Sequence, residues 1–127
     1  MALGKQLASW SYKITSTRYS PGPGKATTLH LDMGGPMSGE LTGMGQGTLT
    51  VVTELGAKNG IWDWCGALYL NDGGILSTSA RGAFEEVGQH KWRLMGVAQT
   101  AEGRTFGTEF EGDFATQTVS GKLCEWS

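Results

Sequence analysis

Ile61-Trp-Asp-Trp-Cys-Gly-Ala-Leu-Tyr-Leu70, followed by Asn71-Asp-Gly-Gly74, is the stretch that decides the fold of this chain. Its large residues alternate with smaller or polar ones, so that Trp62, Trp64, Gly66, Leu68 and Leu70 share one face. This two-residue period is that of a β-strand. The four residues that follow tolerate the positive φ of a tight hairpin turn. The segment therefore predicts a strand that turns back directly into its neighbour.

The same pattern repeats in both directions along the chain. Alternating runs, each closed by a glycine-bearing turn, predict strands at 9–16, 27–33, 46–55, 61–70, 75–86, 91–100, 105–114 and 118–126. Every connection is short and no long crossover is present, which favours a barrel over a two-sheet sandwich. A barrel also hides the strand edges and encloses space for one ligand. We predict an all-β fold, a single antiparallel meander β-barrel of eight strands spanning residues 1–127.

Four stretches are expected to depart from regular strand. Residues 1–8 form an N-terminal tail, and residues 17–26, with Pro21-Gly-Pro-Gly24, form an irregular loop at the rim. Gly34-Gly-Pro36 is expected to end the second strand. Phe84-Glu-Glu-Val87 is the one place where we expect a brief helical turn.

Evenly spaced glycines mark one strand face. Gly39, Gly43, Gly45 and Gly47 are separated by even numbers of residues, so all four lie on the same face of any strand that includes them. A face without side chains permits sharp coiling of the strand or close approach of another group.

Composition limits the classes of function. The 127 residues suit one domain, and a net charge of −2 with 17% charged residues argues against an electrostatic grip on nucleic acid. The first residues lack a secretory pattern and no stretch approaches the roughly 18 apolar residues of a membrane span, so we expect a cytoplasmic protein without a membrane partner. Cys65 and Cys124 stand far apart, which favours free thiols over a zinc site or a disulfide.

Short motifs carry a resemblance to a known group of barrels. The stretches Met37-Ser-Gly-Glu-Leu-Thr-Gly-Met-Gly-Gln-Gly-Thr-Leu49, Arg81-Gly-Ala-Phe84 and Phe110-Glu-Gly-Asp-Phe114 resemble those of small bacterial β-barrels of the allene oxide cyclase-like, calycin-type architecture. The likeness covers residues 27–126. It implies a barrel that folds a reactive apolar substrate in its interior without a cofactor. No position matches a catalytic position of those families, so no catalytic residue is carried over.

Aromatic residues are the best candidates for the wall of a binding site. Five tryptophans lie in predicted strands, and their flat rings suit an apolar or conjugated ligand while the indole N–H can fix one polar atom. The predicted substrate-binding residues are Trp10, Trp62, Trp64, Trp92, Phe110 and Trp126. The alternatives are that these rings simply fill the barrel core, or that they form a subunit interface.

Five side chains are candidates for acid–base chemistry: Asp63, Glu111, Arg81, Tyr69 and His30. Asp63 leads because it lies between two tryptophans in the most apolar strand, and a carboxylate on an interior face would need a partner such as Arg81 or Arg93. The alternative is an outward Asp63 in a structural ion pair.

The acids Glu109, Glu111 and Asp113 share one face of the penultimate strand. Adjacent carboxylates repel one another and prefer water, so we expect a solvated outer face. The alternative is that one of them points inward with a raised pKa and acts as acid or base.

Metal and cofactor chemistry is not indicated. The two histidines, His30 and His90, show no metal-ligand spacing, and the glycine runs lack the helix that a phosphate or dinucleotide loop requires. We therefore expect neither a metal nor a cofactor.

Three functions follow from these observations. The leading hypothesis is a cofactor-independent enzyme that holds one small hydrophobic substrate in an aromatic-lined cavity and assists cyclisation, isomerisation or a proton-transfer elimination. Asp63 or Glu111 would carry the proton, Arg81 would stabilise charge and Tyr69 would donate a hydrogen bond. The alternative is a lipocalin-like carrier of an apolar molecule. In the third, the tryptophans join two or three copies into a homo-oligomer.

Overall fold

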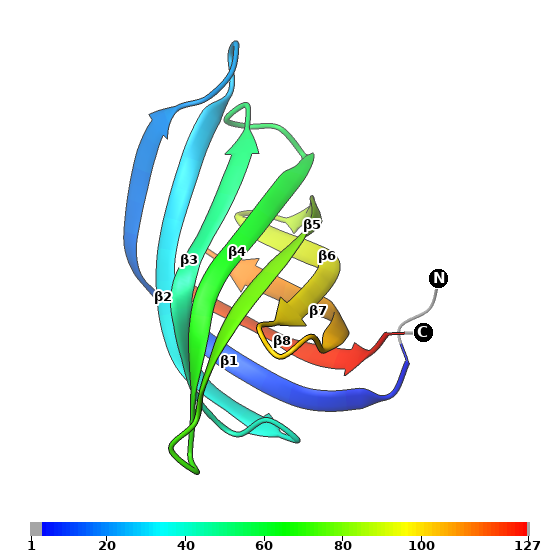
Figure 1. Cartoon of the computed structure of the whole chain (residues 1–127). Helices are drawn as coiled ribbons and strands as arrows, with labels where there is room; N and C mark the ends of the chain where they lie inside the picture. Colours follow the sequence, from blue (N-terminus) through cyan, green and yellow to red (C-terminus); the bar gives the residue numbers. More distant parts are fainter. Residues whose placement is uncertain (1–3, 127) are drawn as a thin grey trace.

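The computed structural model describes residues 4–126 and consists of eight β-strands joined by short turns (Figure 1). The strands are β1 (Gln6–Pro21), β2 (Thr27–Gly39), β3 (Gly43–Thr53), β4 (Asn59–Leu70), β5 (Ile75–Gly88), β6 (Lys91–Thr100), β7 (Thr105–Asp113) and β8 (Thr118–Glu125). No helix occurs within these described residues, and so none that could cross a membrane.

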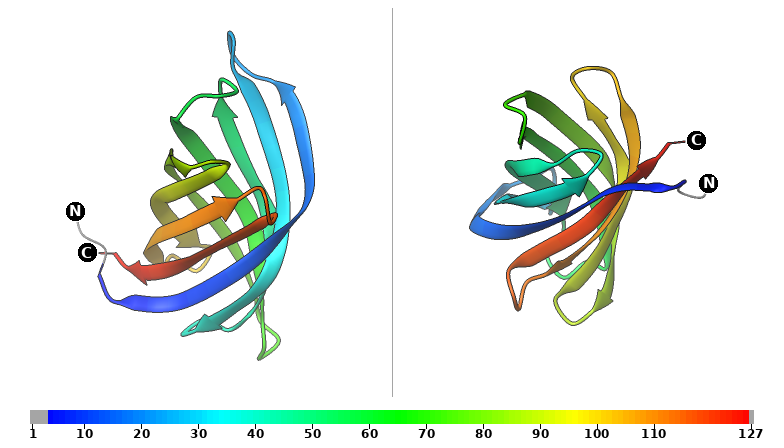
Figure 2. Two further views of the ribbon diagram at one scale, coloured as in Figure 1. Left: turned by 180° about the vertical axis from the view of Figure 1, so that it is seen from behind. Right: turned by 90° about the horizontal axis from the view of Figure 1, so that it is seen from below.

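Each strand pairs antiparallel with the next, and β8 pairs with β1 to close the barrel. This confirms the predicted all-β, eight-stranded meander barrel. The first and last described residues lie near each other at the closure, where the Gly4 N–H donates a hydrogen bond to the Glu125 carbonyl at 3.3 Å (Figures 1 and 2). We call the end with the β1–β2, β3–β4, β5–β6 and β7–β8 turns the upper end, as it stands in Figure 1, and the other the lower end. The β1–β2 hairpin rises furthest at the upper end.

Three local predictions were wrong. The strand β1 begins at Gln6 and runs to Pro21, which pairs with Thr27, so only 22–26 remain as a turn within the predicted loop. Proline is tolerated there because this end of β1 pairs with β2 alone, since the pairing of β1 with β8 stops at Lys13, and proline is accommodated on such an edge. The strand β2 continues through Gly34-Gly-Pro36, since Gly35 has no side chain to meet the Ser11 carbonyl of β1.

The predicted helical turn at 84–87 is also strand. Phe84 pairs with Leu94 of β6 and buries its ring in the barrel, so burial of an aromatic side chain decides the conformation of this segment. The β5 strand therefore continues to Gly88.

Inward glycines lie beside inward aromatic side chains of the same strand or of strands close by in the sheet. A Cβ atom on Gly45 would collide with the Tyr12 hydroxyl, and one on Gly96 would lie 2.8 Å from Trp62 Cζ2. The same relation joins Gly47 and Gly66 to the Trp64 ring and Gly60 to the Phe84 ring, whereas a Cβ atom on Gly121 would collide with Phe110 Cβ. The glycine face predicted from the sequence is therefore an interior face, where the missing side chains make room for large rings.

Buried side chains form two clusters inside the barrel. The larger cluster includes Tyr12, Leu49, Trp62, Phe84 and Phe110. The smaller cluster closes the lower end with Ala8, Met37, Leu41, Leu68, Phe106 and Leu123. Trp10 packs against both clusters. The clusters do not fill the whole interior, and two cavities remain beside them.

Candidate ligand-binding site

Two cavities lie inside the barrel. The inner cavity has a volume of about 70 Å³ and is bounded by the aromatic residues around Trp10 and by the cluster that closes the lower end. The mouth cavity, of about 210 Å³, lies toward the upper end. Leu49 lines both, and the buried Trp62 stands at the inner one, held by a hydrogen bond from its Nε1–H to the Ala83 carbonyl at 3.0 Å.

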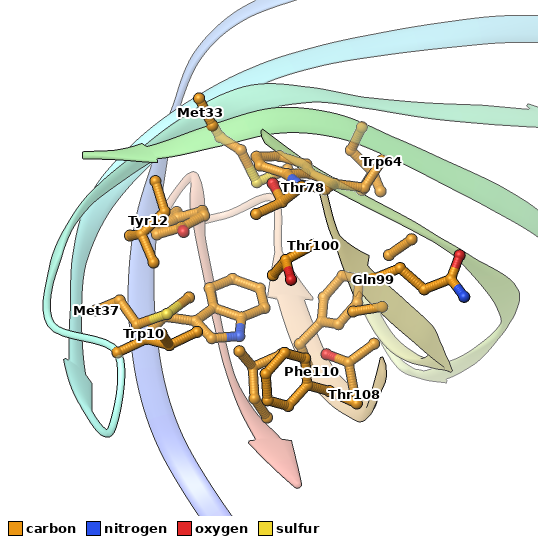
Figure 3. Close-up of a pocket in the computed structure, with 18 of the residues that line it drawn as sticks. Trp10, Tyr12, Met33, Met37, Trp64, Thr78, Gln99, Thr100, Thr108 and Phe110 are labelled. Carbon is orange, nitrogen blue, oxygen red and sulfur yellow. Dashed lines mark hydrogen bonds between the residues drawn. The ribbon is translucent and has the colours of Figure 1, made fainter. Parts of the chain in front are cut away.

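Six aromatic side chains line the inner cavity, and four of them, Trp10, Tyr12, Trp64 and Phe110, are labelled in Figure 3. The ring centroid of Trp10 lies 4.6 Å from that of Tyr12 and 5.1 Å from that of Phe110, and Tyr12 lies 5.9 Å from Trp64. These spacings are those of favourable tilted aromatic pairs. The rings therefore support one another and hold the wall in a fixed shape.

Three threonine hydroxyls also line the inner cavity. Thr78 Oγ1 accepts a hydrogen bond from Trp64 Nε1–H at 2.9 Å, and Thr108 Oγ1 donates to the Lys122 carbonyl at 3.2 Å. Thr100 is only 7% exposed, and its hydroxyl has no hydrogen-bond partner within residues 4–126. Figure 3 shows this hydroxyl near the middle of the space between the rings.

Tyr12 adds a phenol to the same wall. Burial raises the pKa of Tyr12 from 10.0 to about 12, because the apolar surroundings disfavour the charged phenolate. The phenol is thus neutral at physiological pH and able to donate a hydrogen bond.

The mouth cavity is almost wholly apolar. Its walls include Leu29, Leu31, Val51, Phe84, Trp92, Leu94 and Phe114, and of the described residues that line it Glu54 alone is charged. Tyr19 and Leu55 stand at its edge with exposed side chains. Gly112 contributes bare backbone to the wall.

The structure brings five of the six predicted binding residues to the cavities. Trp10, Trp62, Trp64 and Phe110 line the inner cavity, and Trp92 lines the mouth cavity. Trp126 does not take part, because it follows the end of β8 at Glu125 and its side chain is exposed.

The predicted acid and cation lie outside the barrel. The side chains of Asp63 and Arg81 are 61% and 85% exposed, and Arg81 Nε lies 3.8 Å from Asp63 Oδ1. With Trp62 and Trp64 turned inward, the alternation of β4 forces Asp63 outward. Asp63 is therefore outward in a structural ion pair, which is the alternative to a catalytic carboxylate, and neither Asp63 nor Arg81 lines a cavity.

The remaining predicted catalytic residues are likewise outside both cavities. Tyr69 and Glu111 are exposed on the outer faces of β4 and β7. Glu109, next to Glu111 on that face, pairs with Arg93 at 2.6 Å. His30 is on the outer face of β2, with its Nε2 3.2 Å from the Ser20 hydroxyl.

The interior hydroxyls were not among the site residues predicted from the sequence. Thr78, Thr100, Thr108 and Tyr12 carry the hydroxyl groups of the inner cavity, to which the exposed Gln99 adds an amide, whereas the predicted charged residues face solvent. The signal was present, since Thr100 shares its face with Trp92 and Leu94, and Thr108 with Phe106 and Phe110. Within residues 4–126, no three His, Cys, Asp or Glu side chains gather as metal ligands would.

No protein-family model, curated protein or solved structure matches this chain. The structure confirms a closed eight-stranded antiparallel barrel, and none of these comparisons supports membership of the allene oxide cyclase-like families.

Proposed function

We propose that this protein binds one small, uncharged, apolar molecule inside the barrel, with the mouth cavity holding the body of the ligand. The observation that carries the proposal is an apolar cavity of about 210 Å³ that is edged by exposed Tyr19 and Leu55. Filling an apolar cavity with an apolar ligand removes the apolar surfaces of both the ligand and the wall from water.

The volume sets the size of the ligand. An apolar cavity of about 150 Å³ in another protein accepts benzene, and the mouth cavity is somewhat larger at about 210 Å³. A compound with one substituted ring or two small fused rings fits this space. Pure hydrophobic contact with roughly ten heavy atoms gives affinities in the micromolar range by order of magnitude.

A carrier is favoured over the enzyme because the acidic and basic residues expected to perform chemistry face solvent. Asp63 and Arg81 pair on the outer surface, and Glu111 is exposed. A carrier needs only shape and apolar surface, which both cavities supply. The resemblance to barrel-shaped cyclases supports an apolar ligand under either function.

Gly112→Leu tests the proposal. Gly112 lies on the mouth cavity wall, and a Cβ atom placed there meets only Val119 Cγ2, at 3.7 Å, so the added side chain extends into the empty space. Ser120→Leu is the matched control, since it adds the same side chain to the exposed face of neighbouring β8.

Toluene serves as the probe, followed through the indole N–H signal of Trp92 in ¹H–¹⁵N NMR spectra. We expect toluene to shift this signal in the wild type and in Ser120→Leu and to leave it unmoved in Gly112→Leu. An unmoved signal in the wild type, or equal affinity in all three proteins, would refute the proposal.

A cofactor-free reaction is the second candidate, and the buried neutral phenol of Tyr12 favours it. A phenol in an apolar cavity can donate a hydrogen bond to an oxygen that gains negative charge during an isomerisation or cyclisation. Turnover of an apolar epoxide or enone that is lost in Tyr12→Phe while binding persists would support this candidate. Binding of such compounds without turnover would instead support the carrier function.

A further inference from the structure

The inner cavity presents hydrogen-bond donors without partners. Within residues 4–126, no hydrogen bond is made by Thr100 Oγ1, by Tyr12 Oη or by Trp10 Nε1. Thr100 comes from β6, and the other two come from β1 on the opposite part of the wall. Thr78 Oγ1 accepts from Trp64, which leaves its own proton free to donate.

An unpaired buried hydroxyl opposes folding, since a polar group that loses water without gaining a partner is destabilising. Valine has nearly the shape of threonine and would fill the same place on β6 without that penalty. The hydroxyl of Thr100, 7% exposed and directed between the rings, therefore calls for a partner that enters the cavity.

The chemistry of the wall defines that partner. No charged side chain is among the described residues that line the inner cavity, so an ion would enter without a counter-charge. The free polar groups include an indole N–H, which can only donate, and hydroxyls that can donate. An uncharged molecule with an accepting oxygen satisfies these groups.

We infer that the inner cavity is a second binding site, distinct from the mouth cavity, that selects small uncharged molecules or groups with a hydrogen-bond-accepting oxygen, such as ketones and esters. Thr100 is the principal donor, and Tyr12 and Trp10 are further donors on the β1 part of the wall. The volume of about 70 Å³ limits the occupant to a few heavy atoms. Nothing in this inference depends on the mouth cavity holding a ligand.

The test compares two probes of nearly the same shape, cyclobutanone and methylenecyclobutane, which differ in C=O against C=CH₂. Binding is followed through the Trp10 indole N–H in ¹H–¹⁵N NMR spectra, assigned with Trp10→Phe. We expect the wild type to bind the ketone roughly threefold to tenfold more tightly than the hydrocarbon, as one hydrogen bond allows.

Thr100→Val keeps the shape of the wall and removes the hydroxyl. We expect it to abolish the preference for the ketone without weakening binding of the hydrocarbon, and Thr100→Ser to retain the preference. Gly112→Leu, which fills the mouth cavity, should leave the preference unchanged. The inference is overturned if the wild type binds neither probe or binds both equally, or if Thr100→Val retains the preference.

Discussion

Replacing glycine by alanine should have opposite effects at two interior positions, Gly96 on β6 and Gly112 on β7. At Gly96, a Cβ atom would collide with the Arg81 carbonyl of β5 and lie 2.8 Å from Trp62 Cζ2. Neither neighbour can move freely, because the carbonyl belongs to the sheet and the indole is held by its hydrogen bond to Ala83. At Gly112 the nearest atom is 3.7 Å away, an ordinary contact.

The magnitudes follow from these contacts. Overpacking a core costs about 1–3 kcal/mol, and we expect Gly96→Ala to reach the upper part of that range because both obstacles are fixed. Replacing glycine also reduces the conformational entropy of the unfolded chain, which stabilises the folded protein by only about 0.5–1 kcal/mol. At Gly112 that relief acts without a clash, so Gly112→Ala should raise the free energy of unfolding by about 0.5–1 kcal/mol.

Urea unfolding monitored by tryptophan fluorescence measures both variants, with the slope of the transition checked for two-state behaviour. The expected result is a lower midpoint for Gly96→Ala and a higher midpoint for Gly112→Ala. A loss of stability at Gly112 equal to that at Gly96 would refute the assignment of filled space beside one glycine and empty space beside the other.

Three further outcomes are expected. Burial raises the pKa of Tyr12 from 10.0 to about 12, so between these pH values the phenol ionises more readily in the unfolded chain than in the folded protein. The contribution of Tyr12 to stability is therefore intact below pH 10, and up to about 3 kcal/mol of unfolding free energy is lost as the pH rises toward 12. Alkaline unfolding of Tyr12→Phe should lack this loss. Asp63→Asn breaks only an exposed ion pair, so calorimetry should show a stability change within about 0.5 kcal/mol, and a larger loss would mean that Asp63 has another role. Cys65 is exposed and Cys124 is buried, and both thiols are free; a thiol reagent should therefore modify one cysteine rapidly in the native protein and the second only on unfolding, whereas rapid modification of both would contradict the burial of Cys124.

The strand pattern and the glycine face could be predicted from the sequence because both are local signals. Alternation at Ile61–Leu70 and turn residues such as Asn71-Asp-Gly-Gly74 fix strand and hairpin over a few residues. Glycines at even spacing fall on one face of any strand that includes them, and the structure places Gly43, Gly45 and Gly47 on the interior face of β3.

Tertiary structure decided which face is the interior, and with it the composition of the candidate site. Alternation alone assigns Asp63 and Trp62 to opposite faces of β4 without saying which face is inside. Closure of the barrel buries the indole of Trp62 and leaves the carboxylate of Asp63 hydrated, because burying the indole removes more apolar surface from water than burying the carboxylate would. The same closure brings Thr100 of β6 to one cavity with Trp10 and Tyr12 of β1, residues about ninety positions apart in the chain. The cavity exists only where all eight strands meet, so no local pattern could predict its volume or its unpaired hydroxyl.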